Sequence, residues 1–232
     1  NPELIVGFLG CLAQHLGRGV HKRVQNVDLV VGTHNIHRLP EMVKSIQKDR
    51  KKITQIGFSS KIESLGVFVS PQAGSISSFV SIMQGCDNYC AYCVVPYLRG
   101  PEMSRTPEDI ITEIKKLAVC GVREVTLLGQ NVNSYGKNLQ PKSDFVTLIK
   151  KINEIEGIER IRFTTSHPKD LSADLIDCFR ELAKLCEHIH LPIQSGSGRV
   201  LKLMNRGYSA SEYFEKIDSL RSVCPEISIT SD

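Results

Sequence analysis

The chain has 232 residues, of which 41% are hydrophobic and 23% charged, and its formal net charge is +4. This composition is typical of a globular protein and excludes intrinsic disorder and collagen-like repeats. No stretch approaches the roughly 20 apolar residues of a membrane-spanning helix, and residues 1–10 lack the charged region of a secretory signal. We therefore expect a cytoplasmic protein with no membrane partner, whose charge permits nucleic-acid binding without identifying it.

Residues 1–50 predict a small α/β unit. The apolar runs at residues 4–9 and 27–31 are typical of strands, and residues 39–48 have the pattern of a helix. Residues 51–75 are expected to form a linker, whose basic start is best explained by solvent exposure, with attraction for RNA as the alternative. The chain begins without Met and ends directly after a strand-like run, so we expect an interior segment of a longer protein.

From residue 76 to 232, short strand-like runs alternate with amphipathic helical stretches. This alternation is typical of parallel βα architecture, so the fold class is predicted to be α/β, a partial (βα) barrel. Thr106 is expected to cap the first helix, with Pro107 at its first position. The strands are predicted at residues 78–83, 124–128, 160–164, 188–193 and 227–230.

Reactive groups of parallel βα folds gather where the carboxyl ends of the strands share one face. We therefore expect the loops after the first four strands to line one cavity. These loops carry, in chain order, Cys86, Cys90 and Cys93; Gln130 and Asn131; Ser166 and His167; Gln194 and Ser195.

Three of the eight cysteines lie within eight residues, at Cys86, Cys90 and Cys93. A zinc site usually has a fourth Cys or His at comparable spacing, and none follows the loop that closely; the first histidine after the loop is His167. Three thiolates without a close fourth fit an iron–sulfur cluster with one iron open to an external ligand. The remaining cysteines are expected to be reduced and structural, as buried free cysteine commonly is. The paired histidines His188 and His190 are likewise interpreted as hydrogen-bonded structure, with a metal pair as the alternative.

With these elements placed, the sequence resembles the radical S-adenosylmethionine superfamily, whose first barrel strand is followed by Cys-x3-Cys-x2-Cys. Here that motif is Cys86, Cys90 and Cys93, with the aromatic Tyr92 before the last cysteine. The sequence is most similar to the methylthiotransferases, and among them to the MiaB-type tRNA enzymes. The stretches that carry this resemblance are residues 82–100, 104–105, 128–136, 165–168 and 190–197.

The resemblance implies two [4Fe-4S] clusters and S-adenosylmethionine as cofactors. One cluster is expected on Cys86, Cys90 and Cys93. The family holds the second on three cysteines of an N-terminal domain, and residues 10–14 resemble the motif with the last of these, Cys11. Residues 1–50 then correspond to the end of that domain, with the other two ligands upstream. The barrel at 76–232 is expected to stop before its last strand, and the family's small RNA-binding domain would follow it.

The expected contacts to S-adenosylmethionine follow from position in the barrel. Arg206 is expected to pair with the methionyl carboxylate, and Tyr92 to lie beside the adenine. The other candidates are Gln130, Asn131, Gln194 and Ser195. Each has an alternative, because polar loop residues commonly cap helices or meet water and Arg206 can be a charge at a helix end. His167 is a candidate for substrate contact, and Arg99 and Arg105 for RNA phosphate or S-adenosylmethionine.

The resemblance implies methylthiolation at C2 of N6-isopentenyladenosine next to the anticodon, where an unpaired base of the tRNA anticodon stem-loop can be splayed out. No side chain is expected to act as an acid or base, because the reaction requires a radical. The alternatives are methylthiolation of threonylcarbamoyladenosine in tRNA or of a ribosomal-protein aspartate, and a non-catalytic iron–sulfur or zinc RNA-binding module. A monomer is expected, and the sulfur donor stays open.

Overall fold

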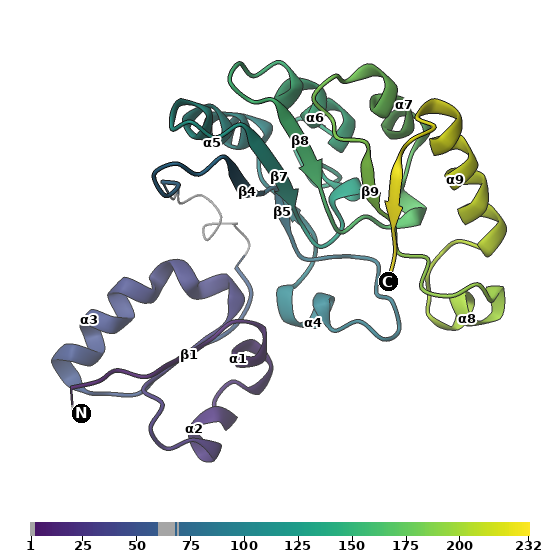
Figure 1. The fold of residues 1–232 in the computed structure, drawn as a ribbon. Coiled ribbons are helices and arrows are strands. Elements are labelled where there is room, and N and C mark those ends of the chain that lie inside the picture. The colour runs from purple at the N-terminus through teal and green to yellow at the C-terminus, as the bar shows by residue number, and fades with distance from the viewer. Residues whose placement is uncertain (1–2, 60–67, 69) are drawn as a thin grey trace. The chain divides into compact units, whose positions relative to one another are not determined.

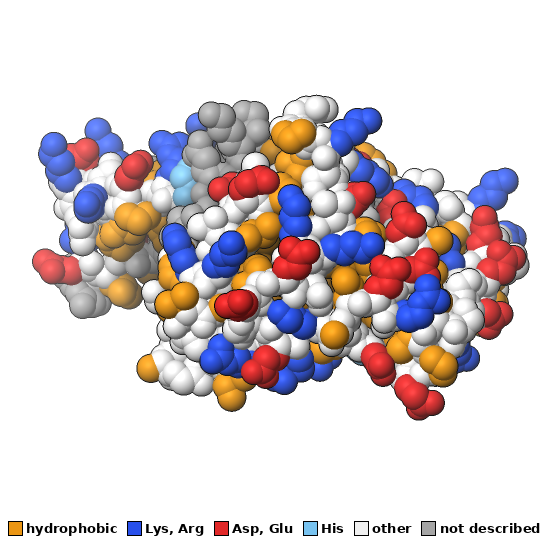
Figure 2. Space-filling model, turned by 90° about the horizontal axis from the view of Figure 1, so that it is seen from above, with side chains coloured by type: hydrophobic (Ala, Val, Ile, Leu, Met, Phe, Trp, Pro, Cys, Tyr) orange, Lys and Arg blue, Asp and Glu red, His pale blue; other side chains and the backbone are white. Residues whose placement is uncertain are grey.

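The computed structural model describes residues 3–59, 68 and 70–232. Two compact units make up the chain: unit 1 comprises Asn1–Val67 and Val94–Pro101, and unit 2 comprises Phe68–Cys93 and Glu102–Asp232. Within the described residues, no helix is long and apolar enough to cross a membrane. On the face in Figure 2, acidic and basic side chains are interspersed, as the small net charge suggests.

Unit 1 is built on a parallel sheet of order β1-β2-β3. The buried central strand carries Val30 on one face, packed with Ala13, Val20 and Val27, and Leu29 and Val31 on the other, packed with α3. The elements are β1 (Gly7–Leu9), α1 (Cys11–Leu16), α2 (Gly19–Arg23), β2 (Leu29–Val31), the 3-10 helix η1 (Thr33–Arg38), α3 (Leu39–Asp49), β3 (Ile53–Gln55) and α4 (Val95–Arg99).

Two segments differ from the predicted domain boundaries. Strand β3 lies inside the segment 51–75 that was expected to be a linker. Its residues, Ile53 to Gln55, pair with β2, and so short and polar a run has no strand pattern in the sequence. Residues 94–101, assigned by sequence to the barrel domain 76–232, belong to unit 1. There Thr33 Oγ1 donates to the carbonyl of Leu98 at 3.0 Å, and His34 Nε2 bonds that of Arg99 at 2.8 Å. Residues 60–67 and 69 of the expected linker lie outside the described residues.

Unit 2 confirms the expected α/β class with parallel strands. The sheet β4-β7-β8 is parallel, β9 and β10 pair in parallel, and Ile161 of β8 bridges to Leu185 just before β9. Figure 1 shows these strands side by side, with α5, α6, α7 and α9 along their outer side. The strands are β4 (Ser77–Ser81), β5 (Met83–Gln84), β6 (Met103–Ser104), β7 (Glu124–Leu128), β8 (Arg160–Phe163), β9 (His188–His190) and β10 (Ser228–Thr230).

The helices of unit 2 begin at polar caps and bury one apolar face. Thr106 caps α5 with Pro107 at its first position, as expected, and Ser209 and Glu212 form a capping box on α9. The core between the helices and the sheet includes the aromatic rings of Phe145 and Phe163, which pack edge to face with their centroids 5.1 Å apart. The elements are α5 (Pro107–Val119), η3 (Val132–Ser134), α6 (Phe145–Asn153), η4 (Pro168–Asp170), α7 (Ala173–Glu181), α8 (Gly198–Leu203) and α9 (Ala210–Val223).

Candidate functional site

The carboxyl ends of β4, β7 and β8 lead into loops that are bonded to one another. After β4 the chain passes through β5 into residues 85–93, the cluster loop, whose Gly85 N–H donates to Gln130 Oε1 at 2.7 Å. The loop after β8 is tied to the loop after β7, because Thr165 Oγ1 donates to the carbonyl of Gly129 at 2.6 Å and Val132 N–H donates to that of Thr165 at 3.2 Å. Gln130 therefore supports the cluster loop.

The three loop cysteines lie close enough to affect one another electrostatically. Burial raises the pKa of the Cys86 thiol, and Cys90 and Cys93 raise it further. Cys86 and Cys90 are buried and Cys93 is half-buried, with its N–H bonded to the carbonyl of Cys90 at 2.9 Å. Among the described residues, no three Cys, His, Asp or Glu side chains already have the arrangement of a bound metal ion. The donor set, three free thiols on one looped segment, nevertheless fits a thiolate-held iron–sulfur cluster.

Residues 204–206, which follow α8 and are called the α8 turn here, are hydrogen-bonded to the cluster loop. Met204 accepts a hydrogen bond from Ala91 N–H at 3.0 Å, and Asn205 Nδ2 donates to the carbonyl of Tyr89 at 3.0 Å. A further bond runs from Lys169 Nζ to Asn88 Oδ1, at 2.5 Å. The loop is thus fastened by side chains that follow β8 and α8, which sequence reasoning did not identify.

Arg206 places a buried guanidinium against the cluster loop. The residue is 6% exposed, and its Nη1 lies 3.3 Å from Cys90 Sγ and 3.3 Å from the Tyr92 hydroxyl. Its Nε donates to the Tyr208 hydroxyl at 3.3 Å. The structure thus brings Arg206 and Tyr92, two of the predicted cofactor contacts, together at a cysteine, although Tyr92 is itself half exposed.

The loop after β7 is organised around Asn131 and Asp170. Asn131 is 2% exposed and its Nδ2 donates to Asp170 Oδ2 at 2.7 Å, while Lys137 pairs with Asp170 Oδ1 at 2.9 Å. The Asn131 carbonyl accepts from the Ser134 hydroxyl, which also bonds the carboxylate of Glu102. Burial raises the pKa of Glu102 to about 7, against the lowering effects of Ser134 and Lys137.

Several buried polar atoms near these strand ends have no hydrogen-bond partner among the described residues. Such atoms are rare in folded proteins, because each costs about 1–3 kcal/mol when it stays unpaired, so each calls for a partner such as a water molecule or a ligand. The hydrogen bonds of His167 show which ring nitrogen is the donor. Nδ1 accepts from Lys169 N–H at 3.2 Å, so the neutral ring carries its proton on Nε2. The unpartnered atoms here are Gln84 Nε2, Glu102 Oε1, Asn131 Oδ1, Ser166 Oγ and His167 Nε2.

The loop after β9 carries two further candidates, Gln194 and Ser195. Gln194 is half-buried and adopts φ +69°, a left-handed conformation that redirects the chain toward α8. The Ser195 hydroxyl accepts from Ser197 N–H at 3.1 Å, so it makes a local bond within the loop that precedes α8.

Two further sequence candidates are occupied by structural contacts. Arg105 is buried, pairs with Glu113 at 2.7 Å and donates to the carbonyl of Ser81 at 2.8 Å, so its charge is already compensated. His188 and His190 both bond the Thr230 hydroxyl, at 3.2 and 3.1 Å, which is the hydrogen-bonded structural arrangement expected for them.

Cys11 lies in unit 1, at the first position of α1 directly after β1 and Gly10. Its thiol is free and half-buried. Gly10 has φ +98°, which L side chains rarely adopt, so the turn that presents Cys11 depends on glycine.

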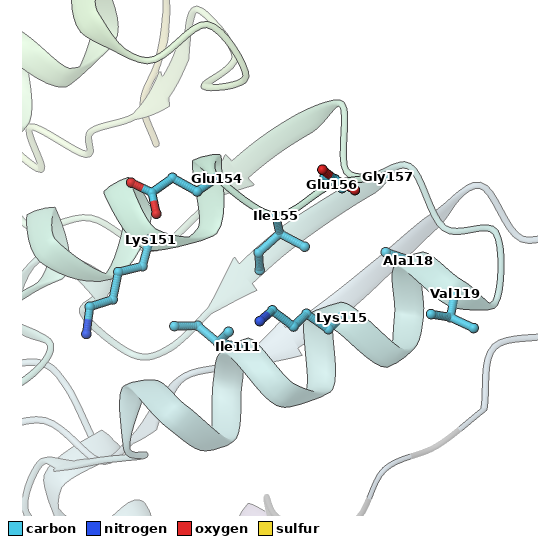
Figure 3. A pocket seen from close by; sticks show the side chains of 9 residues that line it. All are labelled: Ile111, Lys115, Ala118, Val119, Lys151, Glu154, Ile155, Glu156 and Gly157. Atoms are coloured by element: carbon cyan, nitrogen blue, oxygen red, sulfur yellow. The ribbon is translucent and has the colours of Figure 1, made fainter.

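The hollows on the surface differ in their relation to the strand ends. A groove of about 840 Å³ lies between α5 and the end of α6, where Ile111, Lys115 and Glu154 line it (Figure 3). Gly157, which also lines this groove, lies on the segment leading into the amino end of β8, whereas the cluster loop follows the carboxyl end of the parallel strand β4. A hollow of about 390 Å³ is lined by Arg206 and Tyr208 and adjoins the candidate site.

Comparison with known proteins agrees with this geometry. The profile of the Radical SAM superfamily matches residues 80–231. The tRNA-2-methylthio-N(6)-dimethylallyladenosine synthase of Syntrophus aciditrophicus is 57% identical over 230 residues, which are 99% of this chain and 50% of that protein. The synthase of the same name from Geobacter metallireducens is 53% identical over 235 residues, 100% of this chain and 53% of that protein. The chain thus spans about half the length of these curated relatives.

Among solved structures, the cobalamin-dependent S-adenosylmethionine radical enzyme OxsB, with aqua-cobalamin and S-adenosylmethionine bound, has a TM-score of 0.66. It is 12% identical and covers 98% of this chain and 36% of its own, so the likeness concerns the fold alone. The profile match, the parallel βα unit and the cysteine loop agree with one another, and the chain belongs to the Radical SAM superfamily.

Proposed function

We propose that the protein of which this chain is part adds a methylthio group to C2 of N6-isopentenyladenosine next to the anticodon of tRNA. The observation that carries the proposal is the 57% identity, over nearly the whole chain, with a relative named for that product. The arrangement of Cys86, Cys90 and Cys93 in a loop at the end of a parallel strand supports the same chemistry. Its setting would be the cytoplasm, and its state a monomer.

The residues proposed to hold the cofactors are the loop thiols and Cys11. Cys86, Cys90 and Cys93 supply three ligands to a [4Fe-4S] cluster with one open iron, and Cys11 supplies one ligand to a second cluster. The first cluster supplies the one-electron reduction that cleaves the sulfonium of S-adenosylmethionine, which gives a radical able to abstract hydrogen from an unactivated carbon. Because burial raises the pKa of Cys86, loading the cluster displaces a proton from that thiol.

S-Adenosylmethionine is proposed to lie over the cluster loop, with its carboxylate on Arg206. Nη1 and Nε of Arg206 are engaged, whereas Nη2 has no hydrogen-bond partner among the described residues and can donate hydrogen bonds to an anion. Tyr92 is proposed to lie beside the adenine. The other proposed contacts are Asn131, through its unpartnered Oδ1, Gln194 and Ser195, while Gln130 acts through its bond to Gly85.

The substrate is proposed to be the unpaired base of a tRNA anticodon stem-loop. Unpaired loop bases can be splayed into a cavity and recognised by hydrogen bonds along their edges. The buried unpartnered donors and acceptors of His167 and Ser166, between the loops after β7 and β9 in chain order, match that kind of recognition.

The test measures the modified nucleosides of tRNA by mass spectrometry in cells with and without the gene. Restoring the gene is expected to restore the methylthio mark, and Cys90→Ala to abolish it. Cys120→Ala is the matched control, because Cys120 is an exposed cysteine outside the loop. A mark lost from threonylcarbamoyladenosine or from a ribosomal-protein aspartate would instead identify one of the two related substrates, and no loss of any mark would refute the proposal.

A further inference from the structure

The α8 turn and the cluster loop meet at two residues in the left-handed backbone conformation. Tyr89 has φ +46° and Asn205 has φ +57°, so both adopt the left-handed region that non-glycine residues seldom occupy. They are bonded to each other, because Asn205 Nδ2 donates to the carbonyl of Tyr89. With the Met204–Ala91 bond, this contact holds the middle of the loop in place before any metal enters.

Arg206 is the only charged group that this turn presents to a thiol in the part of the chain that the structure describes. Its partners are Cys90, Tyr92 and Tyr208, and no described carboxylate forms an ion pair with it. The Tyr208 ring lies 5.4 Å from the guanidinium carbon, and its hydroxyl donates to the carbonyl of Ile193 at 2.7 Å. The guanidinium is therefore fixed in orientation, with its positive charge facing sulfur.

A fixed cation that donates a hydrogen bond to a ligating sulfur changes the reduction potential of the cluster. Reduction adds one negative charge to the cluster, and a buried cation stabilises the reduced form more than the oxidised form. Hydrogen bonds to the sulfurs and net charge are among the factors that set cluster potentials, and partners of metal ligands tune the metal.

We propose that Arg206, through its contact with Cys90, raises the reduction potential of the cluster held in the loop, so that an external one-electron donor can reduce it. The inference rests on the proposed function, because it requires that Cys90 be a cluster ligand. Arg206 acts here as a positioning and charge-bearing residue, in addition to any contact with S-adenosylmethionine. One electron passes from the donor to the cluster, and no bond to Arg206 forms or breaks.

The test is a redox titration of the reconstituted protein, followed by electron paramagnetic resonance without S-adenosylmethionine. Arg206→Met, which removes charge and donors, is expected to lower the ratio of reduced to oxidised cluster at the wild-type midpoint by about tenfold, equivalent to a fall in the midpoint of about 59 mV for one electron. Arg206→Lys is expected to lie between Met and the wild type. An unchanged midpoint in Arg206→Met would overturn the inference.

Asn205→Gly is the matched control for loop positioning. Glycine keeps the left-handed conformation and loses the bonds to Tyr89 and Asn88, whereas Arg206 stays in place. Its midpoint is expected to equal that of the wild type, and a shift as large as that of Arg206→Met would assign the effect to loop geometry and refute a role of the charge.

If Arg206→Met holds no iron, Arg206→Lys and Arg206→Gln decide, because both donate hydrogen bonds and only lysine is charged. A higher potential for Lys than for Gln is required, and equal potentials overturn the inference. A wild-type protein that loads no cluster, or loads one and cleaves no S-adenosylmethionine, is evidence against the proposed function. The comparison of reduction midpoints between the wild type and the Arg206 variants tests only the inference about Arg206.

Discussion

Glu102 gives a prediction that can be worked from its surroundings. The side chain is 7% exposed, one carboxylate oxygen accepts from the Ser134 hydroxyl, and the other has no partner among the described residues. Burial raises the pKa of Glu102 from 4.5 to about 7, and the nearby carboxylates of Asp87 and Asp170 raise it as well, against the lowering effects of Ser134 and Lys137. The folded protein therefore retains a proton that the unfolded chain releases.

The sign of the pH dependence follows from this difference. A raised pKa in the folded state contributes stability that is fully present below the unfolded pKa and is lost as the pH rises through the folded one. For Glu102 the window runs from 4.5 to about 7, and the difference corresponds to about 3 kcal/mol of unfolding free energy. Glu102→Gln keeps the shape and removes the titration, so its stability relative to the wild type is expected to increase by about that amount across the window.

The assay is urea unfolding of the metal-free protein at several pH values, followed by far-ultraviolet circular dichroism. The quantity compared is the difference between wild type and variant, in which the other titrating groups cancel. Glu226→Gln, at an exposed position, serves as the control for replacing a glutamate by glutamine. A wild-type minus Glu102→Gln difference that stays constant from pH 4.5 to about 7 would refute the buried, protonated carboxyl.

Three further outcomes are expected. Gly136→Ala should destabilise the protein by more than 2 kcal/mol, roughly, in urea unfolding, because Gly136 has φ +94° and an added Cβ would overlap the Ser143 carbonyl. Gly121→Ala, with the same φ and open space around it, should cost only about 1 kcal/mol; equal losses would contradict the overlap. The ring of His167 should stay neutral from about pH 5 to 8 in nitrogen NMR, because burial, with a contribution from Arg206, lowers its pKa to about 3, and titration near 6.5 would contradict its enclosure.

Prediction from sequence was strongest where one local pattern had one physical meaning. The alternation of strand-like and amphipathic runs gave the parallel architecture, and Thr106 with Pro107 gave the start of α5, because caps act within four residues. It was weakest where a segment takes its structure from a distant partner. Strand β3 is only Ile53 to Gln55 and exists through pairing with β2, and α4 is placed in unit 1 by bonds to Thr33 and His34.

The same division runs through the candidate site. The amino-acid sequence by itself determined the donor set, because three cysteines at spacings of four and three can serve one centre only from a loop, and it also determined which loops follow parallel strands. Only the tertiary structure decided what each polar residue does. Gln130 accepts a hydrogen bond from Gly85, Arg105 forms an ion pair with Glu113, and Arg206 contacts the sulfur of Cys90. The contacts of Gln130 with Gly85 and of Arg206 with Cys90 join residues 45 and 116 positions apart. No local spacing encodes such pairings, because only folding of the sheet and its helices brings these residues within hydrogen-bond distance.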